Sequence, residues 1–166
     1  MRSPIVTPAV DVGRADVMLV CSTGGHLLQL HQLREAWAGR SVLWVTFDKS
    51  DARSLLTDER VVYAFGPTNR SLTNLLRNLV LAWGIVRRVR PRLLITTGAG
   101  VAVPFAWIAR LRGARVFYVE SITRMEEPSL SCRLIAPVAD RIYAQWPELA
   151  ARMRNAVYAG SVFSER

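Results

Sequence analysis

Short, uncharged apolar runs alternate with stretches of helical periodicity along most of this sequence. Residues 17–21 form the first run, and Leu27, Leu30, Leu33 and Trp37 then recur at helical spacing. Runs of this kind are typical of strands buried on both faces of a sheet. Because strands that alternate with helices pair in parallel, the pattern predicts an α/β fold. We expect a single Rossmann-like, doubly wound parallel sheet with helices on both faces.

The same pattern locates the individual elements. The predicted strands are residues 17–21, 42–47, 61–65, 93–97, 115–119 and 141–145. The predicted helices are the stretch after His26, then 50–56, 71–88, 101–111 and 130–139, and a last one that opens at Pro147. Ser50 is the expected N-cap of the second helix, because a serine hydroxyl can accept from free helix amides. Pro147 is a favourable first-turn residue.

The chain has 166 residues, enough for one domain with a single core but too few for two full α/β domains. Residues 1–15 carry prolines and charges without an apolar core segment, which predicts a mobile tail and no secretory signal. The domain is expected at 16–166. Residues 93–109 form the longest uncharged run, which is too short for a transmembrane helix and is interrupted by glycine and proline.

The net charge of +9 predicts an anionic partner, which could be nucleic acid, phospholipid head groups or a phosphorylated substrate. Cys21 and Cys132 lie far apart in the sequence, and His26 and His31 are five residues apart. This spacing predicts neither a disulfide framework nor a metal cluster. The expected setting is reducing and cytoplasmic.

Three polar or glycine-rich segments follow predicted strands directly. In parallel α/β sheets the active crevice lies at the carboxyl ends of the strands, so these segments form a candidate site at one edge. Its residues are Ser22, Thr23, Gly24, Gly25 and His26 after the first strand, Thr97, Gly98 and Gly100 after the fourth, and Glu120 and Arg124 after the fifth.

In the first segment, Gly24 and Gly25 allow a sharp turn and the close approach of a ligand to the backbone. The helix that follows offers free N–H groups and a positive dipole end, which favour phosphate. His26 can bind an anion or exchange a proton near neutral pH. A tight turn capped by a histidine explains the same residues without a ligand. The segment is neither a dinucleotide fingerprint nor a P-loop, because GxGxxG and a lysine after the glycines are absent.

The other two segments leave a similar choice open. Thr97, Gly98 and Gly100 either cradle a diphosphate or form a packing turn where a helix meets the sheet. Glu120 ends an apolar strand and is expected to face the crevice. There it would orient a sugar hydroxyl, act as a base, or simply pair with Arg124.

The predicted helix 71–88 has a wide apolar face flanked by arginines, with leucines and Trp83 at helical spacing. Either this face packs on the sheet, or it rests on an anionic membrane, for which tryptophan and arginine beside an apolar face are typical. A nucleic-acid partner is not expected, because no aromatic-bearing sheet motif is present. The residues expected to face the membrane are Leu76, Leu79, Trp83 and Arg87, with Phe105 and Trp107 from the next helix.

Five motifs occur in a fixed order, and together they carry a resemblance. They are STGGHL, TTGAG followed by VAVPFAWIARL, YVESITR, ADRIYAQWPELA and AVYAGSVF. In this order they resemble the accessory subunit family of the two-subunit UDP-N-acetylglucosamine transferase of asparagine-linked glycosylation. Counterparts of this family occur in bacterial capsule and exopolysaccharide clusters, and the chain resembles those. The resemblance covers nearly everything from residue 17 to residue 162.

The resemblance implies the N-terminal half of a GT-B glycosyltransferase, similar to the enzyme that adds N-acetylglucosamine to the lipid-linked peptidoglycan precursor. A complete GT-B enzyme has two Rossmann-like domains, and its donor nucleotide sits mainly in the C-terminal one. A small catalytic partner would therefore supply the second half of a heterodimer and bind the UDP-sugar. This chain would bind the polyprenyl-diphosphate-linked sugar acceptor, need no cofactor or metal, and be inactive alone.

The resemblance also implies roles for the site residues. Gly24, Gly25 and His26 match the loop near the acceptor diphosphate, and the base would be His26, Glu120 or a group of the partner. Eukaryotic members carry an N-terminal membrane span that these 166 residues lack. Attachment through the arginine-edged helices is therefore expected, as a monotopic or peripheral subunit on the cytoplasmic face of the inner (plasma) membrane. Two alternatives remain, a pure membrane scaffold for a transferase and a self-sufficient nucleotide-binding enzyme.

Overall fold

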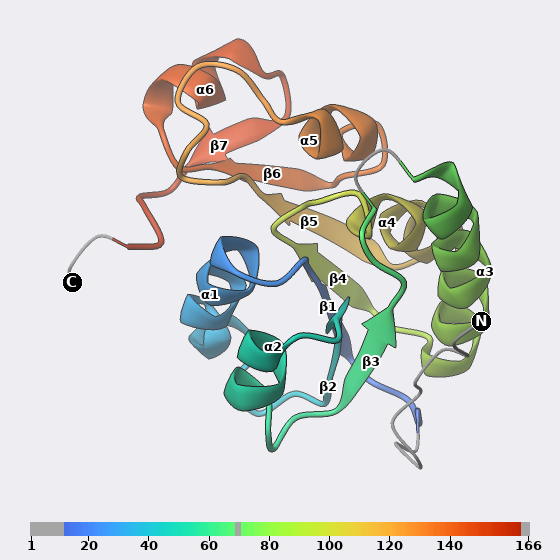
Figure 1. The fold of residues 1–166 in the computed structure, drawn as a ribbon. Coiled ribbons are helices and arrows are strands. Elements are labelled where there is room, and N and C mark those ends of the chain that lie inside the picture. The colour runs from blue at the N-terminus through green and yellow to red at the C-terminus, as the bar shows by residue number, and fades with distance from the viewer. Residues whose placement is uncertain (1–11, 69–70, 164–166) are drawn as a thin grey trace.

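The computed structural model describes residues 12–68 and 71–163. Its centre is a sheet of seven parallel strands in the order β3-β2-β1-β4-β5-β6-β7 (Figure 1). The chain winds outward in both directions from β1, which lies between β2 and β4. The predicted α/β, doubly wound fold is therefore confirmed. The strands are β1 (Val17–Val20), β2 (Val42–Phe47), β3 (Val61–Ala64), β4 (Leu93–Thr96), β5 (Arg115–Val119), β6 (Arg141–Ala144) and β7 (Ala156–Tyr158).

Helices cover both faces of this sheet, and alternate strand residues pack against each layer. Val17 and Leu19 lie in the cluster beneath α1 (Gly25–Gln32), the 3-10 helix η1 (Arg34–Trp37) and α2 (Ser50–Leu55). Met18 and Val20 lie in the cluster beneath α3 (Leu72–Val89), α4 (Ala102–Leu111) and α5 (Leu130–Ile135). The last helix, α6 (Pro147–Arg152), packs beside β6 and β7.

Three local predictions were wrong or incomplete. The residue that precedes α2 as its N-cap is Lys49, without a side-chain cap, and Ser50 is already helical. The helix predicted for 130–139 ends at Ile135, because Pro137 cannot continue the hydrogen-bond ladder. The edge strand β7 was not predicted, since it is only three residues long and none of them is fully buried.

Residues 1–11 of the predicted N-terminal tail lie outside the described residues. The last part of that tail is packed, since Val12 and Ala15 are buried in the cluster on the α3 side of the sheet. The Ala15 N–H donates to the Val89 carbonyl at 3.4 Å. The packed part of the chain therefore begins at least four residues before position 16.

Candidate functional site

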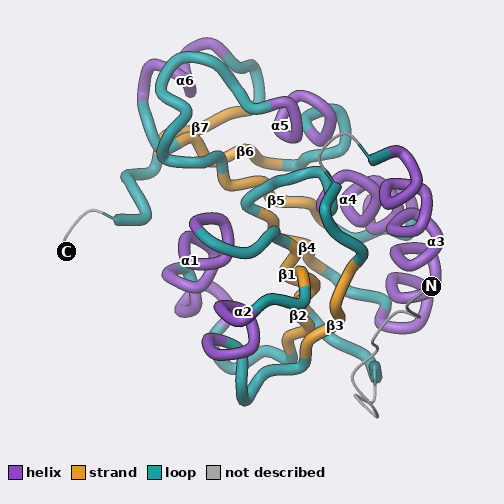
Figure 2. The backbone as a smooth tube through the Cα atoms, in the orientation of Figure 1, coloured by secondary structure: helices purple, strands orange, loops and turns teal. Residues whose placement is uncertain are grey.

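The carboxyl ends of β1, β4 and β5 bring the three predicted segments together. The Thr97 hydroxyl donates to the His26 carbonyl oxygen at 2.9 Å, which joins the turn after β4 to the start of α1. The buried Gln29 side-chain amide donates to the Glu120 carbonyl oxygen at 2.7 Å and joins α1 to the end of β5. Figure 2 shows the long loop from β5 to α5 in teal. The prediction that these segments share one edge of the sheet is confirmed.

The first segment exposes open backbone. Gly24 has φ 74° and ψ −137°, a conformation that residues with a side chain avoid. A methyl group added at Gly24 or Gly25 would meet no heavy atom within 4 Å. The Gly24 N–H already donates to Oδ2 of Asp51, in the first turn of α2, at 2.6 Å. Asp51 is a site residue that the sequence analysis missed, although its place just beyond the end of β2 was an available signal.

His26 is half-buried in the first turn of α1. Its Nδ1 atom is buried and has no hydrogen-bond partner among the described residues. A buried ring nitrogen normally finds a partner, so this nitrogen could still bond to a ligand or a water molecule. Ser22 and Thr23 are also half-buried, and the Ser22 hydroxyl donates to the Thr23 carbonyl oxygen at 3.4 Å.

The turn after β4 is filled by the protein itself. The Gly98 N–H donates to the Thr96 hydroxyl at 2.9 Å, and the Ala99 N–H donates to the Ser131 hydroxyl at 3.3 Å. A methyl group at Gly98, where φ is 98°, would collide with the Tyr118 hydroxyl. A methyl group at Gly100 would lie only 3.0 Å from the Thr68 hydroxyl, so the space there is also small. Packing alone therefore accounts for the glycine at position 98, and Thr97 is buried.

Glu120 is fully buried, so the expectation that it faces the crevice was wrong. One carboxylate oxygen accepts from the Ser121 N–H at 2.8 Å. The other accepts from the Ser129 N–H at 2.8 Å and from the Ser129 hydroxyl at 3.0 Å. Strand residues two apart face the same side of a sheet, so Glu120 follows Tyr118 into the core. Both of its oxygens therefore accept hydrogen bonds from protein donors.

The core also contains the thiols of Cys21 and Cys132 and the phenol of Tyr118, and burial keeps these three groups neutral. Burial raises the pKa of the Cys21 thiol to about 12. Burial also raises the pKa of the Tyr118 phenol and that of the Cys132 thiol, and the nearby Glu120 carboxylate raises both further. Groups with raised pKa values of this kind are poor nucleophiles near neutral pH. These side chains are therefore structural.

The loop between Glu120 and Ser129 is fixed near its start by a contact with the segment after β6. The Trp146 indole N–H donates to the Ile122 carbonyl oxygen at 2.7 Å. Arg124 is exposed on this loop and does not pair with Glu120, contrary to one of the expected roles. Its guanidinium forms no ion pair within the described ranges 12–68 and 71–163. Arg124 therefore presents a positive charge beside the site.

Helix α3 packs on the sheet through a narrow stripe and leaves its leucines outside. Its buried residues are Asn78, Ala82, Val86 and Val89. The Asn78 side chain exchanges two hydrogen bonds of 2.9 Å with the Phe65 backbone, one in each direction. The sequence left two alternatives for the leucine face, and the first of them, packing on the sheet, is therefore wrong.

The outward side of α3 continues across its neighbours α4 and α5, and we call this surface the apolar face. The Trp107 indole N–H donates to the Leu134 carbonyl oxygen at 3.0 Å, which joins α4 to α5. Within residues 12–68 and 71–163, no helix is both long enough and apolar enough to cross a membrane. The exposed apolar residues of this face are Leu72, Leu75, Leu76, Leu79, Val80, Trp83, Trp107, Leu111, Leu130 and Leu134.

Most residues predicted to face a membrane lie on the apolar face or at its border, with one error. Leu76, Leu79 and Trp83 are exposed on α3, and Trp83 is 52% exposed. Arg87 is exposed in the last turn of α3, and Trp107 is exposed on α4. Phe105 is fully buried in the core. Residues two apart on a helix point in different directions, so Phe105 and Trp107 could not share one face.

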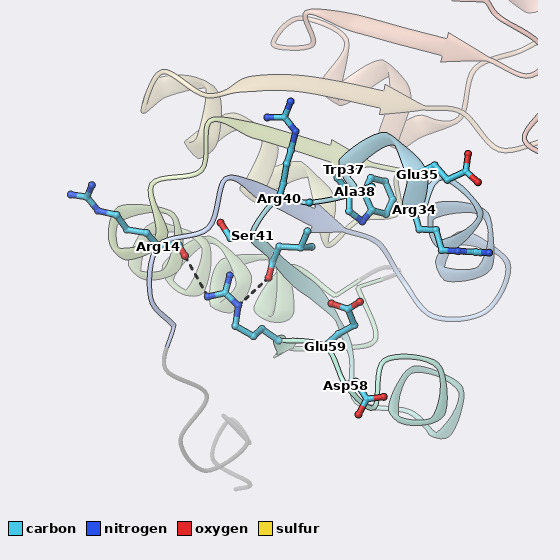
Figure 3. A pocket seen from close by; sticks show the side chains of 12 residues that line it. Arg14, Arg34, Glu35, Trp37, Ala38, Arg40, Ser41, Asp58 and Glu59 are labelled. Atoms are coloured by element: carbon cyan, nitrogen blue, oxygen red, sulfur yellow. Dashed lines mark hydrogen bonds between the residues drawn. The ribbon is translucent and has the colours of Figure 1, made fainter.

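Two hollows open at the opposite, amino edge of the sheet. The larger, of about 700 Å³, lies where β1, β2 and β3 begin (Figure 3) and is lined by side chains of both charges. Arg60 crosses it and donates to the carbonyl oxygens of Val42 and Arg14 at 3.1 and 3.4 Å. Ligands of parallel α/β sheets bind at the carboxyl edge, so this hollow is not the candidate site.

The second hollow, of about 510 Å³, lies at the end of the apolar face where α3 and α4 stop. It is lined by Arg90, Pro91, Arg92, Arg112, Gly113 and Arg115 and by no acidic residue. Its positive charge suits an anionic ligand or surface. In the described part of the chain, no group of three His, Cys, Asp or Glu side chains is placed to hold a metal ion.

Solved structures share this fold over nearly the whole chain. MurG of Acinetobacter baumannii superposes with a TM-score of 0.71 at 17% identity, covering 91% of this chain and 47% of that one. A UDP-N-acetylglucosamine 2-epimerase superposes equally well, with a TM-score of 0.71 at 10% identity, and covers 90% of this chain and 47% of that one. The chain thus spans about half the length of the solved proteins whose fold it shares.

Sequence comparison points in the same direction. A protein-family profile described as "Oligosaccharide biosynthesis protein Alg14 like" matches residues 60–162. The "UDP-N-acetylglucosamine transferase subunit ALG14" of Eremothecium gossypii is 30% identical over an alignment of 197 residues, covering 93% of this chain and 87% of that protein. The human protein of the same name is 25% identical and covers 98% of this chain and 88% of its own length. The chain therefore belongs to the Alg14-like family of oligosaccharide biosynthesis proteins.

Proposed function

We propose that this chain is the acceptor-side subunit of a split UDP-sugar-dependent glycosyltransferase and is inactive alone. The observation that carries the proposal is the family to which the chain belongs. Relatives that align over most of their length are named transferase subunits, and the chain spans only about half of a MurG chain of the same fold. A small catalytic partner would complete the heterodimer and bind most of the UDP-sugar. The product would serve lipid-linked oligosaccharide, capsule or exopolysaccharide biosynthesis.

The acceptor is proposed to be a polyprenyl-diphosphate-linked sugar bound at the carboxyl edge of the sheet. The open backbone of Gly24 and Gly25 supports this role, because a ligand can approach it without displacing a side chain. The unpaired Nδ1 of His26 and the exposed guanidinium of Arg124 add groups that can bond to phosphate or hydroxyl oxygens. The turn from Thr97 to Gly100 contributes mainly by supporting His26 through its carbonyl group.

The proposed reaction is a displacement at the anomeric carbon of the donor sugar. A base removes the proton of an acceptor hydroxyl, whose oxygen then forms the new bond to that carbon. The bond to UDP breaks, and UDP leaves with the electron pair. His26 is the candidate base of this chain, since Glu120 is engaged by protein donors. Backbone amides and cations at the site would stabilise the diphosphate charge.

The apolar face is proposed to rest on the cytoplasmic surface of the plasma membrane, where a polyprenyl acceptor resides. Supporting this, α3 turns its small residues to the core and its leucines outward. The arginine-lined hollow lies beside the ends of α3 and α4, where it would reach anionic head groups. The attachment would be peripheral or monotopic.

Binding measurements test this division of labour. The whole chain is placed in nanodiscs that contain anionic lipid, and the retention of labelled lipid acceptor and labelled UDP-sugar is measured with and without the partner. We expect the chain alone to retain the acceptor, and UDP-sugar to be retained only when the partner is present. His26→Ala should weaken acceptor binding or transfer, and His31→Ala, on the same helix, serves as the matched control. Tight UDP-sugar binding by the chain alone would indicate a self-sufficient enzyme, and absence of acceptor binding would indicate a scaffold.

A further inference from the structure

The glycine loop after β1 is held from outside by a carboxylate of another helix. Oδ2 of Asp51 accepts the Gly24 N–H at 2.6 Å, across 27 residues of sequence. A hydrogen bond from a backbone N–H to a charged carboxylate is shorter and stronger than a neutral one. Asp51 thus joins α2 to the first residue before α1.

This contact matters because packing does not hold Gly24 in place. Apart from Gly24 and its two chain neighbours, no heavy atom of the described residues lies within 4 Å of the position where a Gly24 side chain would begin, although φ there is +74°. The two hydrogen bonds of its backbone are the N–H to Asp51 and the carbonyl oxygen, which accepts from the Leu28 N–H at 3.0 Å. The second bond belongs to α1 itself, so among the residues that the structure describes only Asp51 bonds this residue to another element.

Asp51 is free to serve the loop because the charged residues on either side of it, Asp48 before α2 and Arg53 within α2, pair with one another. Asp48 holds Arg53 through two hydrogen bonds of 2.6 and 2.8 Å. The Asp51 carboxylate forms no ion pair within residues 12–68 and 71–163. Its charge is therefore directed to the backbone of the glycine loop.

We propose that Asp51 is a positioning residue for the transfer reaction, because its hold on the Gly24 amide sets where α1 begins and where the His26 imidazole lies. This inference rests on the proposed function. His26 lies two residues beyond Gly24, and its carbonyl group is fixed on the far side by Thr97. Asp51 and Thr97 thus grip the first turn of α1 from two sides of the site.

Kinetics of the complex between this chain and its catalytic partner test the inference. Asp51→Ala is expected to lower kcat about tenfold or more, since small displacements of a catalytic group are costly. The KM for UDP-sugar should stay unchanged, because the partner holds that substrate. Asp51→Asn keeps an acceptor oxygen and should lose less activity than Asp51→Ala. Asp48→Asn removes a carboxylate from the same region without touching the loop and is the matched control.

A double substitution separates positioning from an independent role. If Asp51 acts through His26, then His26→Ala combined with Asp51→Ala should be no slower than His26→Ala alone. If the kcat losses of the two single variants multiply in the double variant, the inference is wrong. It is also wrong if Asp51→Ala keeps the kcat of the wild type. Thermal unfolding of each variant verifies that the fold is kept.

A structural readout keeps this inference distinct from the proposed function. The Gly24 amide resonance in an NMR spectrum of the isotope-labelled chain should move in Asp51→Ala and stay in place in Asp48→Asn. If the wild-type complex transfers no sugar, the proposed function fails, and the resonance still tests the contact. If the wild-type complex is active but the Gly24 resonance does not move in Asp51→Ala, only the positioning role of Asp51 is wrong.

Discussion

Ser129 donates two hydrogen bonds to a single carboxylate oxygen of Glu120, from its N–H at 2.8 Å and from its hydroxyl at 3.0 Å. The two residues are nine positions apart, so this pair closes the loop that carries Arg124. The Ser129 hydroxyl also accepts from the Cys132 N–H at 3.1 Å as the N-cap of α5. One buried carboxylate therefore links the end of β5, the loop and the start of the next helix.

Glu120→Ala should destabilise the fold rather than only slow a reaction. It leaves the half-buried N–H groups of Ser121 and Ser129 without their acceptor and opens a cavity in the core, which should lower the free energy of unfolding by about 3 kcal/mol. Urea unfolding measures the change. Glu59→Ala, at an exposed site on the other edge of the sheet, is the control and should shift the value by less than about 0.5 kcal/mol. Equal stability of Glu120→Ala and wild type would show that the hydrogen bonds from Ser121 and Ser129 to Glu120 do not stabilise the fold.

The glycines of the two turns should respond differently to alanine. At Gly98 an added methyl collides with Tyr118 at a positive φ, so Gly98→Ala should cost about 3 kcal/mol. At Gly25 the space is open and φ is helical, so Gly25→Ala should change stability by less than about 1 kcal/mol. If the open backbone binds the acceptor, Gly25→Ala should weaken acceptor binding while the fold is kept. A Gly25→Ala variant that binds and transfers normally would argue against a ligand at this loop.

The sequence was sufficient for six of the seven strands and for predicting that their loops meet at one edge. Charge-free runs located β1, β2 and β4, and an apolar run after Arg115 located β5. Residues that follow parallel strands must gather at one edge. It was not sufficient for side-chain direction. Helix α3 has two apolar stripes, and only packing decides that Ala82 and Val86 face the core.

Two of the errors could have been avoided by simple geometry. Glu120 directly follows β5, two residues after Tyr118, and an extended chain turns residues two apart to the same side of the sheet. Phe105 and Trp107 are two residues apart on a helix and could not share a face. The contact between Asp51 and Gly24 is different, because it depends on how α2 lies against α1 and no local pattern encodes it.

The apolar face should bind anionic lipid vesicles through Trp83. Trp83→Glu is expected to lower the fraction bound about tenfold or more, because a large apolar side chain is replaced by a charge that anionic lipid repels. Cosedimentation with vesicles measures this. Leu28→Glu is the matched control, since Leu28 is 47% exposed on α1, which covers the other face of the sheet. Equal losses in both variants, or none in Trp83→Glu, would contradict membrane attachment through this face.

Alkaline pH should destabilise the protein through its buried thiols and phenol. The pKa of Cys21 is about 12 when folded and 9.0 in its ordinary state, because burial disfavours the thiolate. The unfolded chain therefore binds fewer protons than the folded chain above pH 9, and the free energy of unfolding falls as pH rises. A single such thiol contributes a fall of about 1 kcal/mol per pH unit in this range.

Cys21→Ala should reduce that fall, although it also changes core packing at every pH. The comparison is therefore the difference in unfolding free energy between pH 7 and pH 10.5, measured by urea for each protein. A Cys21→Ala variant with the same pH dependence as the wild type would show that this thiol does not contribute.

Transfer of labelled sugar from UDP-sugars into the lipid fraction tests the split-transferase proposal most directly. Membranes would contain this chain alone, the small partner alone, or both together. We predict activity only when both chains are present, with His26→Ala losing activity while the two chains still copurify. Full activity from this chain alone, or from the partner alone, would contradict the proposal that each chain supplies half of one active site.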